Sequence, residues 1–304
     1  MNTMLTKQTK LTKSFLWIFI LLLSLSACSK AATPEVVETI LPEAATVTPT
    51  LAEPTATSVP AAAIVNGEPV PLNWFEGELA RYLQAQEAMG LTVESDSAAR
   101  DVVLNDLIDQ VLLAQAAREE GAVISDQAVQ DRLDELASEV DLAAWMAEWG
   151  YSEADLFQSL KLQLLAGFQR EKIAESVPSE MEQVELRQIF AYTEEGAKRA
   201  MVGLNSGRDF EEVAFEYDPV TGGYLGWIPQ GYLLIPAVEE AAFSLALEEH
   251  SEIIESEIGY HIVTVLSREE RSLSADARLT LQRVALHNWI EQTRAKSEIQ
   301  VVID

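Results

Sequence analysis

Apolar residues recur at helical spacing between residues 95 and 178, and this periodicity restricts that stretch to a helical fold. Ser95, Ser125 and Ser152 each precede such a run, so each is predicted to cap the first turn of a helix. The helix after Ser95 must bury one face, which carries Leu104, Leu107, Ile108, Val111 and Leu112. Pro178 ends the last of these helices, so residues 62–178 are predicted to form one helical domain.

The residues after Pro178 change to a mixed pattern. Strands are predicted at 185–191, 252–255 and 260–266, and helices at 194–205, 209–217 and 238–247. A glycine-rich turn at 221–227 leads through a loop into the last of these helices. This order of elements is typical of a compact α+β domain.

The two ends of the folded part are predicted to meet. Residues 62–70 are expected to form a hairpin, because Asn66-Gly67 accepts the positive φ of a tight turn, and a helix follows at 73–89. A helix at 275–296 and a strand at 299–303 close the chain, and the strand has no partner nearby in sequence. We expect it to pair with the hairpin, which makes the fold class α+β: a helical domain completed by the C-terminal helix and strand (275–304), with the second domain inserted.

The N-terminus carries the pattern of an export signal. Three lysines precede an apolar run at 15–25, and small residues lead to Cys28, so residues 1–27 are predicted to be a signal peptide. Leu25-Ser26-Ala27-Cys28 resembles the lipobox of bacterial lipoproteins, which implies a lipidated Cys28 and an extracytoplasmic, membrane-anchored protein. An ordinary secreted protein is the alternative, although Cys28 is the only cysteine of the chain.

Residues 28–61 are built of Ala, Thr, Pro, Glu and Val, a composition that predicts an extended, disordered tether. The formal net charge of the whole chain is −28, and removing a leader with three lysines and no acid makes the remainder more negative still. A chain of this charge is not expected to bind nucleic acid. The same negative charge opposes contact with an anionic lipid surface, so the chain is expected to be held at the membrane by its lipid alone.

Five motifs in the second domain occur in the order and at the spacing of a known family. They are Arg187-Gln188-Ile189-Phe190, Gly207-Arg208-Asp209-Phe210, Gly222-Gly223-Tyr224-Leu225-Gly226-Trp227, Glu240-Ala241-Ala242-Phe243 and Gly259-Tyr260-His261-Ile262-Val263. Through them, residues 181–268 resemble the parvulin (PpiC-like) family of peptidyl-prolyl cis-trans isomerases. The flanking residues resemble the helical chaperone domain of the SurA and PrsA foldases, with Ile64-Val65-Asn66-Gly67 as its opening signature.

The resemblance implies a substrate site in the second domain. It assigns a proline pocket to Leu225, Leu234 and Val238, beside the motif residues Trp227 and Phe243. For the three pocket residues, plain core packing is the alternative interpretation.

The same resemblance assigns a polar set to four positions. His261 matches the histidine on the last strand of the family, and Ser256 falls where the family often has a hydroxyl. Gln188 replaces the usual first-strand histidine and cannot titrate. The loop that holds the Cys or Asp of the family is shortened in this chain, so Asp218 either stands in for the missing acid or is a turn residue before Pro219, and the turn role is slightly favoured.

The resemblance implies a foldase that isomerises X-Pro bonds in unfolded or extended exported polypeptides, with no cofactor and no metal. The changes at Gln188 and Asp218 leave open a second function, a holding chaperone or assembly factor with a degenerate isomerase domain. A ligand-binding lipoprotein ranks last, because the two-lobed α/β pattern that it needs is absent. Hydrolase triads, paired metal-ligand spacings and phosphate loops are also absent from the sequence.

Overall fold

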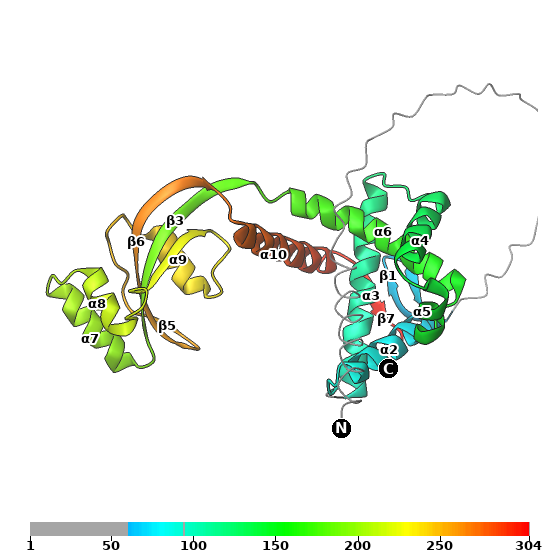
Figure 1. Ribbon diagram of the computed structural model, residues 1–304, viewed down its shortest axis with the longest axis horizontal. Coiled ribbons are helices and arrows are strands. Elements are labelled where there is room, and N and C mark those ends of the chain that lie inside the picture. Colours follow the sequence, from blue (N-terminus) through cyan, green and yellow to red (C-terminus); the bar gives the residue numbers. More distant parts are fainter. Residues whose placement is uncertain (1–59, 94, 304) are drawn as a thin grey trace, which may run out of the picture. The chain divides into compact units, whose positions relative to one another are not determined.

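The computed structural model describes residues 60–93 and 95–303 (Figure 1). The predicted signal peptide, Cys28 and nearly all of the predicted tether lie outside the described residues. In the described part of the chain, no helix is long and apolar enough to cross a membrane.

After the N-terminal hairpin, residues 72–175 of the described chain are mostly helical, as their periodicity predicts. The helices are α2 (Leu72–Ala88), α3 (Asp96–Glu119), α4 (Asp126–Glu139), α5 (Leu142–Trp149) and α6 (Glu153–Glu175). The predicted serine caps are confirmed: Ser95, Ser125 and Ser152 each accept a hydrogen bond from a first-turn amide at 3.1 Å. Helix α3 is the centre of this core, with ten buried residues, and it packs against α2, α6 and the N-terminal hairpin.

The predicted meeting of the two chain ends is confirmed. A three-stranded antiparallel sheet has the order β2 (Glu68–Pro71), β1 (Ala61–Val65), β7 (Ile299–Val301). Asn66 forms the turn with a φ of 50°, and its side-chain oxygen accepts from the backbone amide of Glu298 at 2.9 Å. Because the same residue makes the hairpin turn and bonds the C-terminal segment, the turn also fixes where β7 enters the sheet.

Helix α10 (Ala275–Arg294) connects the second domain back to this core. It packs along α6 through Ala285, Leu286 and Trp289. At its last turn, Arg294 bonds Asp109 of α3 at 2.5 Å and the backbone oxygen of Asn105 at 2.9 Å. A cation at a helix C-terminus is also favoured by the helix dipole.

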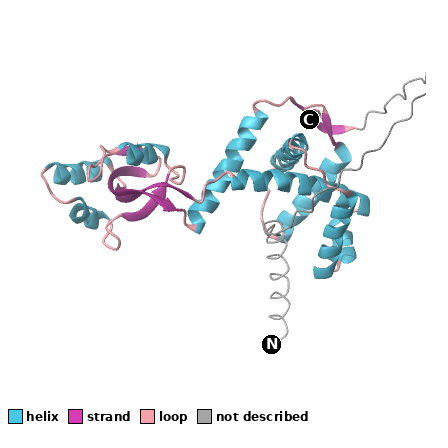
Figure 2. Cartoon of the chain, turned by 90° about the horizontal axis from the view of Figure 1, so that it is seen from above, coloured by secondary structure: helices cyan, strands magenta, loops and turns pink. Residues whose placement is uncertain are grey.

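The second domain is a four-stranded antiparallel sheet with helices on both faces (Figure 2). Its strands have the order β4 (Tyr224–Pro229), β3 (Glu180–Ala191), β6 (Gly259–Ser272), β5 (Ile254–Ser256). Helices α7 (Glu194–Asn205) and α8 (Phe210–Tyr217) cover one face, and α9 (Pro236–Ser244) covers the other. The two faces form separate buried clusters, because successive side chains of a strand point in opposite directions.

Several boundaries in this domain differ from the sequence prediction. Strands β3 and β6 are longer than expected, because their polar ends continue the pairing from Glu180 to Ser272. Residues 224–229 form a strand where a turn and a loop were predicted. Gly226 lowers the strand propensity of this segment, but pairing with β3 overrides it: Ile228 lies opposite Val184, and both are buried.

Candidate functional site

The candidate site lies on the α9 face of the sheet, where β3, β5 and β6 meet. Gln188 and Phe190 of β3 fall on this face with Leu186, and His261 of β6 lies directly opposite Phe190. His261 is 1% exposed. The rings of Phe190 and His261 lie 5.1 Å apart at a tilt of 47°. The sheet register therefore brings together residues that are far apart in sequence.

A chain of hydrogen bonds joins three of the predicted residues. Nδ1 of His261 lies 3.1 Å from Oε1 of Gln188, and Nε2 lies 2.7 Å from Oγ of Ser256. The Ser256 hydroxyl donates to the backbone oxygen of Gly259 at 3.0 Å and accepts from the amide of Ile258. Ser256 therefore ties the imidazole to the β5–β6 turn.

The side-chain amide of Gln188 suits a neutral imidazole in either tautomer. It carries both a carbonyl oxygen and an NH₂ group, so it can accept from Nδ1–H or donate to a bare Nδ1. Oε1 of Gln188 only accepts, so its contact with Nδ1 requires a proton on Nδ1, and Nε2 of His261 is then an acceptor for the Ser256 hydroxyl, which it shares with the backbone oxygen of Gly259. Gln188 thus keeps the imidazole satisfied without adding a second titrating group.

Burial lowers the pKa of His261 below its ordinary value near 6.5. The imidazole is therefore neutral at pH 7. A histidine with a lowered pKa contributes stability that is complete above about pH 6.5. Below that pH the unfolded chain binds a proton that the folded chain does not, so the free energy of unfolding falls.

Because of His261, we expect the free energy of unfolding to fall by up to about 1.4 kcal/mol for each pH unit, from pH 6.5 down to the lowered pKa of this residue. Thermal unfolding at pH 7.5 and pH 5.5 measures this loss. His261→Asn is expected to flatten the pH dependence relative to the parent chain, and His250→Asn serves as the matched control. An unchanged slope in His261→Asn would contradict a buried neutral imidazole.

Asp218 acts in a turn. Its carboxylate accepts hydrogen bonds from the Thr221 hydroxyl and from the amides of Val220 at 3.0 Å, Thr221 at 3.3 Å and Gly223 at 3.2 Å. These bonds, led by that of the Thr221 hydroxyl, lower the pKa of Asp218 to about 2. The turn role that the sequence slightly favoured agrees with this geometry. Within the described part of the chain, the hydrogen bonds of this side chain all go to the turn. A catalytic role for Asp218 stays a prediction.

The turn held by Asp218 is hydrogen-bonded to the backbone of Gln188. Gly223 has a φ of 70°, and its backbone oxygen accepts from the amide of Gln188 at 2.8 Å. A Cβ at position 223 would lie 1.8 Å from the backbone oxygen of Gln188. The family motifs contain Gly223 and Phe190 without indicating a role for either, because the close backbone approach that requires this glycine arises only in the folded structure.

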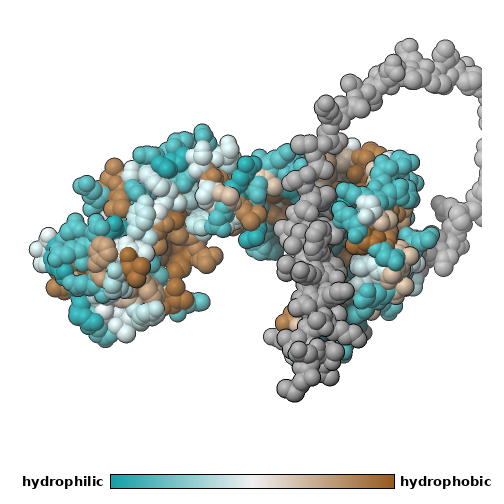
Figure 3. Space-filling view, viewed as in Figure 1, coloured by the Kyte–Doolittle hydropathy of each residue, from teal (hydrophilic) through white to brown (hydrophobic). Residues whose placement is uncertain are grey.

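The predicted proline pocket separates into buried and exposed members. Val238 is 2% exposed in the cluster under α9, which agrees with the core-packing alternative. Leu225 and Leu234 are 41% and 95% exposed. Figure 3 shows hydrophobic residues gathered on the surface around α9. The two leucines are thus available to a substrate, and their assignment to a pocket stays a prediction.

Trp227 and Phe243 lie beside arginines. The ring of Trp227 lies 4.1 Å from the Arg271 guanidinium, and that of Phe243 lies 5.9 Å from the Arg268 guanidinium. Trp227 pairs with Glu185, one position out of phase with the buried Ile228, so its side chain points to the sheet face opposite Gln188. Trp227 is therefore placed apart from the residues around His261.

Comparison with known proteins identifies both parts of the chain. Residues 51–160 match the model of the SurA-like N-terminal domain, and residues 178–267 match that of the PPIC-type PPIase domain, also called rotamase. The site described above thus lies in a peptidyl-prolyl isomerase domain of the parvulin class. The chain combines a SurA-like N-terminal domain with a PPIC-type PPIase domain.

Relatives carry names that fit these two domains. The chain is 26% identical over 231 residues to the foldase protein PrsA of Halalkalibacterium halodurans, covering 67% of this chain and 66% of that protein. It is 28% identical over 151 residues to the chaperone SurA of Dechloromonas aromatica, covering 42% of this chain and 34% of that protein. The crystal structure of the peptidylprolyl isomerase PrsA from Bacillus anthracis is 21% identical, with a TM-score of 0.45, covering 64% of this chain and 96% of that chain. The chain thus spans less than two thirds of the length of either sequence relative.

Proposed function

We propose that the chain is an extracytoplasmic, lipid-anchored foldase that binds unfolded exported polypeptides and accelerates the isomerisation of their X-Pro bonds. The observation that carries this proposal is the linked set Gln188–His261–Ser256 inside a PPIC-type PPIase domain. The SurA-like domain supports the polypeptide-binding part. The leader and Cys28 support export and anchoring.

The reaction that we propose needs no nucleophile. Rotation about a peptide bond breaks amide resonance, with a barrier of about 18–20 kcal/mol. The twisted amide is less polar than the planar one, so a site that excludes water from the carbonyl favours the twisted state. Each gain of about 1.4 kcal/mol in that preference accelerates rotation tenfold.

The residues of the site suit such a mechanism. Leu225 offers an exposed apolar side chain at the start of β4 for the proline ring. His261 is neutral and held on both ring nitrogens, so it stays in place without adding a charge near the amide. Hydrogen bonds fixed in advance cost no reorganisation when the amide twists.

Proline isomerisation in a short X-Pro peptide tests the proposal. The parent chain is expected to accelerate cis-to-trans conversion, and Leu225→Ala and His261→Ala are each expected to lower kcat/KM about tenfold or more, equivalent to ~1.4 kcal/mol. His250→Ala is the matched control, because among the described residues the His250 side chain is hydrogen-bonded only to the backbone oxygen of Ser251, in the same domain. Equal rates in the parent and both site variants would refute the assignment.

A second candidate function is a holding chaperone whose PPIase domain binds extended segments without turning them over. Gln188 favours it, since this residue occupies the position of the first-strand histidine of the family. Suppression of client aggregation by a folded chain that does not accelerate isomerisation would support this function. Restoration of isomerisation by Gln188→His would then identify position 188 as the cause.

A further inference from the structure

Helices α4, α5 and α6 carry an apolar cluster that is incompletely covered. Three of its members are buried and nine are only partly buried. Helix α5 has the sequence LAAWMAEW, yet none of its residues is buried. A helix this apolar normally gains stability by burying one face. The cluster therefore leaves apolar surface facing solvent.

The exposed side of this cluster lines an open cavity of about 630 Å³. Its apolar lining comes from all three helices and from the residue that follows α4: Leu133, Ala137, Val140, Leu142, Ala143, Met146, Leu156 and Phe157. The volume lies within the range of about 300–1,000 Å³ that is common for binding sites. Met146 has a flexible side chain that can adjust to differently shaped apolar groups. We call this cavity the α4–α6 groove.

The polar lining of the α4–α6 groove is acidic. It consists of Asp134, Asp141, Glu153 and the neutral Gln130. Among the described residues, none of the three acids forms an ion pair, and the nearby Arg132 is paired with Glu135. Asp134 accepts from Gln130 at 2.9 Å and Asp141 caps α5 at 3.0 Å, and each carboxylate keeps further acceptor sites.

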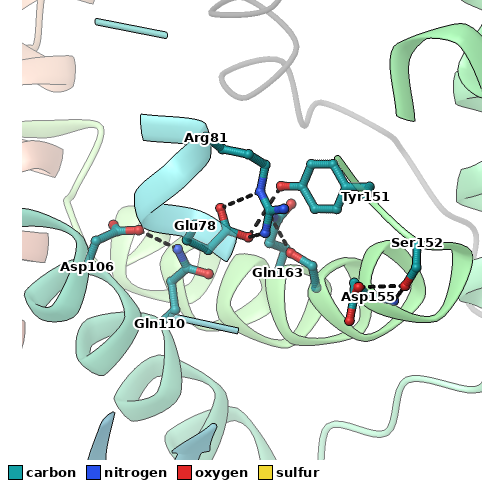
Figure 4. Close-up of polar contacts among 9 residues, drawn as sticks. Glu78, Arg81, Asp106, Gln110, Tyr151, Ser152, Asp155 and Gln163 are labelled. Atoms are coloured by element: carbon teal, nitrogen blue, oxygen red, sulfur yellow. Dashed lines mark hydrogen bonds and ion pairs between the residues drawn. The ribbon is translucent and has the colours of Figure 1, made fainter. Parts of the chain in front are cut away.

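The wall formed by α5 is held in place from α2. Glu78, Arg81 and Tyr151 point toward one another in Figure 4. Arg81 bonds Glu78 at 2.9 Å and lies 3.8 Å from the centre of the Tyr151 ring, which stacks on Trp145 of α5 at 5.3 Å. Burial raises the pKa of Tyr151, so its hydroxyl remains a donor to Glu78. These contacts therefore hold the α5 side of the α4–α6 groove in position.

We propose that the α4–α6 groove binds segments of unfolded polypeptide in which apolar side chains are flanked by lysine or arginine. The apolar lining recognises the aliphatic or aromatic side chains, and the unpaired carboxylates at positions 134, 141 and 153 attract the flanking cations. This inference rests on the proposed chaperone function and names the sequence class that the helical domain selects.

Binding of two labelled peptides to the full-length chain in mild detergent tests the proposal. Both peptides contain the same leucine and phenylalanine residues, flanked by lysines in one and by glutamates in the other. Fluorescence anisotropy is expected to show at least tenfold tighter binding of the lysine peptide at low salt. The preference is expected to shrink at 0.5 M NaCl, because salt screens exposed charges. Equal affinities at low salt would overturn the charge selection.

Two groove variants locate the binding site. Ala143→Arg places a large cation among the lining residues and is expected to weaken lysine-peptide binding at least tenfold. The matched control is Ala144→Arg, which makes the same change at an exposed position of the same helix outside the lining. The double variant Asp134→Asn, Glu153→Gln is expected to reduce the difference between the two peptides. Equal weakening by Ala143→Arg and Ala144→Arg would overturn the assignment to the groove.

Isomerisation measured on the same preparations separates this inference from the proposed function. Ala143→Arg is expected to leave the isomerisation of a short X-Pro peptide unchanged, since α5 lies outside the PPIase domain. A parent chain that isomerises the short peptide but binds neither labelled peptide would overturn the groove and leave the isomerase function standing. A chain that binds the lysine peptide through the groove without isomerase activity would support the groove alone.

Discussion

Replacing Gly223 by alanine is expected to lower the free energy of unfolding of the PPIase domain by about 3 kcal/mol or more. Two costs combine at this position. The φ of 70° is unfavourable for any residue with a side chain, and the added Cβ would lie 1.8 Å from the backbone oxygen of Gln188. Backbone atoms cannot move aside as a flexible side chain can, so β3 and the turn must separate.

The same change is expected to abolish acceleration of X-Pro isomerisation, because the bond from the amide of Gln188 to the backbone oxygen of Gly223 is lost. Chemical denaturation and the isomerisation assay measure the two effects. Gly207→Ala is the matched control: its φ is 89°, but a Cβ there would meet nothing within 4 Å. This control is expected to cost about 1 kcal/mol. Similar losses in both variants would show that steric contact with β3 is unimportant.

Deleting residues 299–304 is expected to lower the stability of the helical domain by about 4 kcal/mol. The deletion removes β7, and with it the partly buried side chains of Ile299 and Ile303, each contributing about 1 kcal/mol. It also removes backbone bonds to β1, including that from Val302 to Ala62 at 2.9 Å, each contributing about 1 kcal/mol. Strand β1 then becomes an exposed edge.

Hydrogen exchange resolved along the chain measures this deletion, because it reports the two parts separately. Protection is expected to fall in β1, β2 and α3 and to persist in β3 and β6. The double variant Val301→Ala, Val302→Ala is the control, since both side chains are about half exposed and the backbone ladder is kept. Unchanged protection of β1 after the deletion would contradict a structural role for the C-terminal strand.

The predictions that succeeded depend on interactions between neighbours in sequence. A serine before an amphipathic run caps a helix wherever the rest of the chain lies, which is why Ser95, Ser125 and Ser152 could be assigned. Asn66-Gly67 likewise forms its turn from local conformational preference. The pairing of β1 with β7 was predictable only by elimination, since the closing strand lacked a local partner.

The candidate site shows where sequence reasoning reached its limit. Gln188 and His261 lie 73 residues apart, and only a family resemblance placed them together before the structure did. The turn role of Asp218 was one of two interpretations, and four hydrogen bonds agree with it. Strand β4 was missed, because its stability comes from pairing with β3 and not from the propensity of its own glycine-containing segment.

The sequence by itself determined the helices, the serine caps, the hairpin turn and, apart from β4, the order of elements in the PPIase domain, because these follow from local propensity and apolar periodicity. Only the tertiary structure decided which side chains share a face and which apolar residues stay uncovered. Val238 became core while Leu234 stayed in solvent, and α5 kept its apolar face open beside the acids of the α4–α6 groove. Burial depends on what packs against a residue from distant parts of the chain, and no local pattern contains that information.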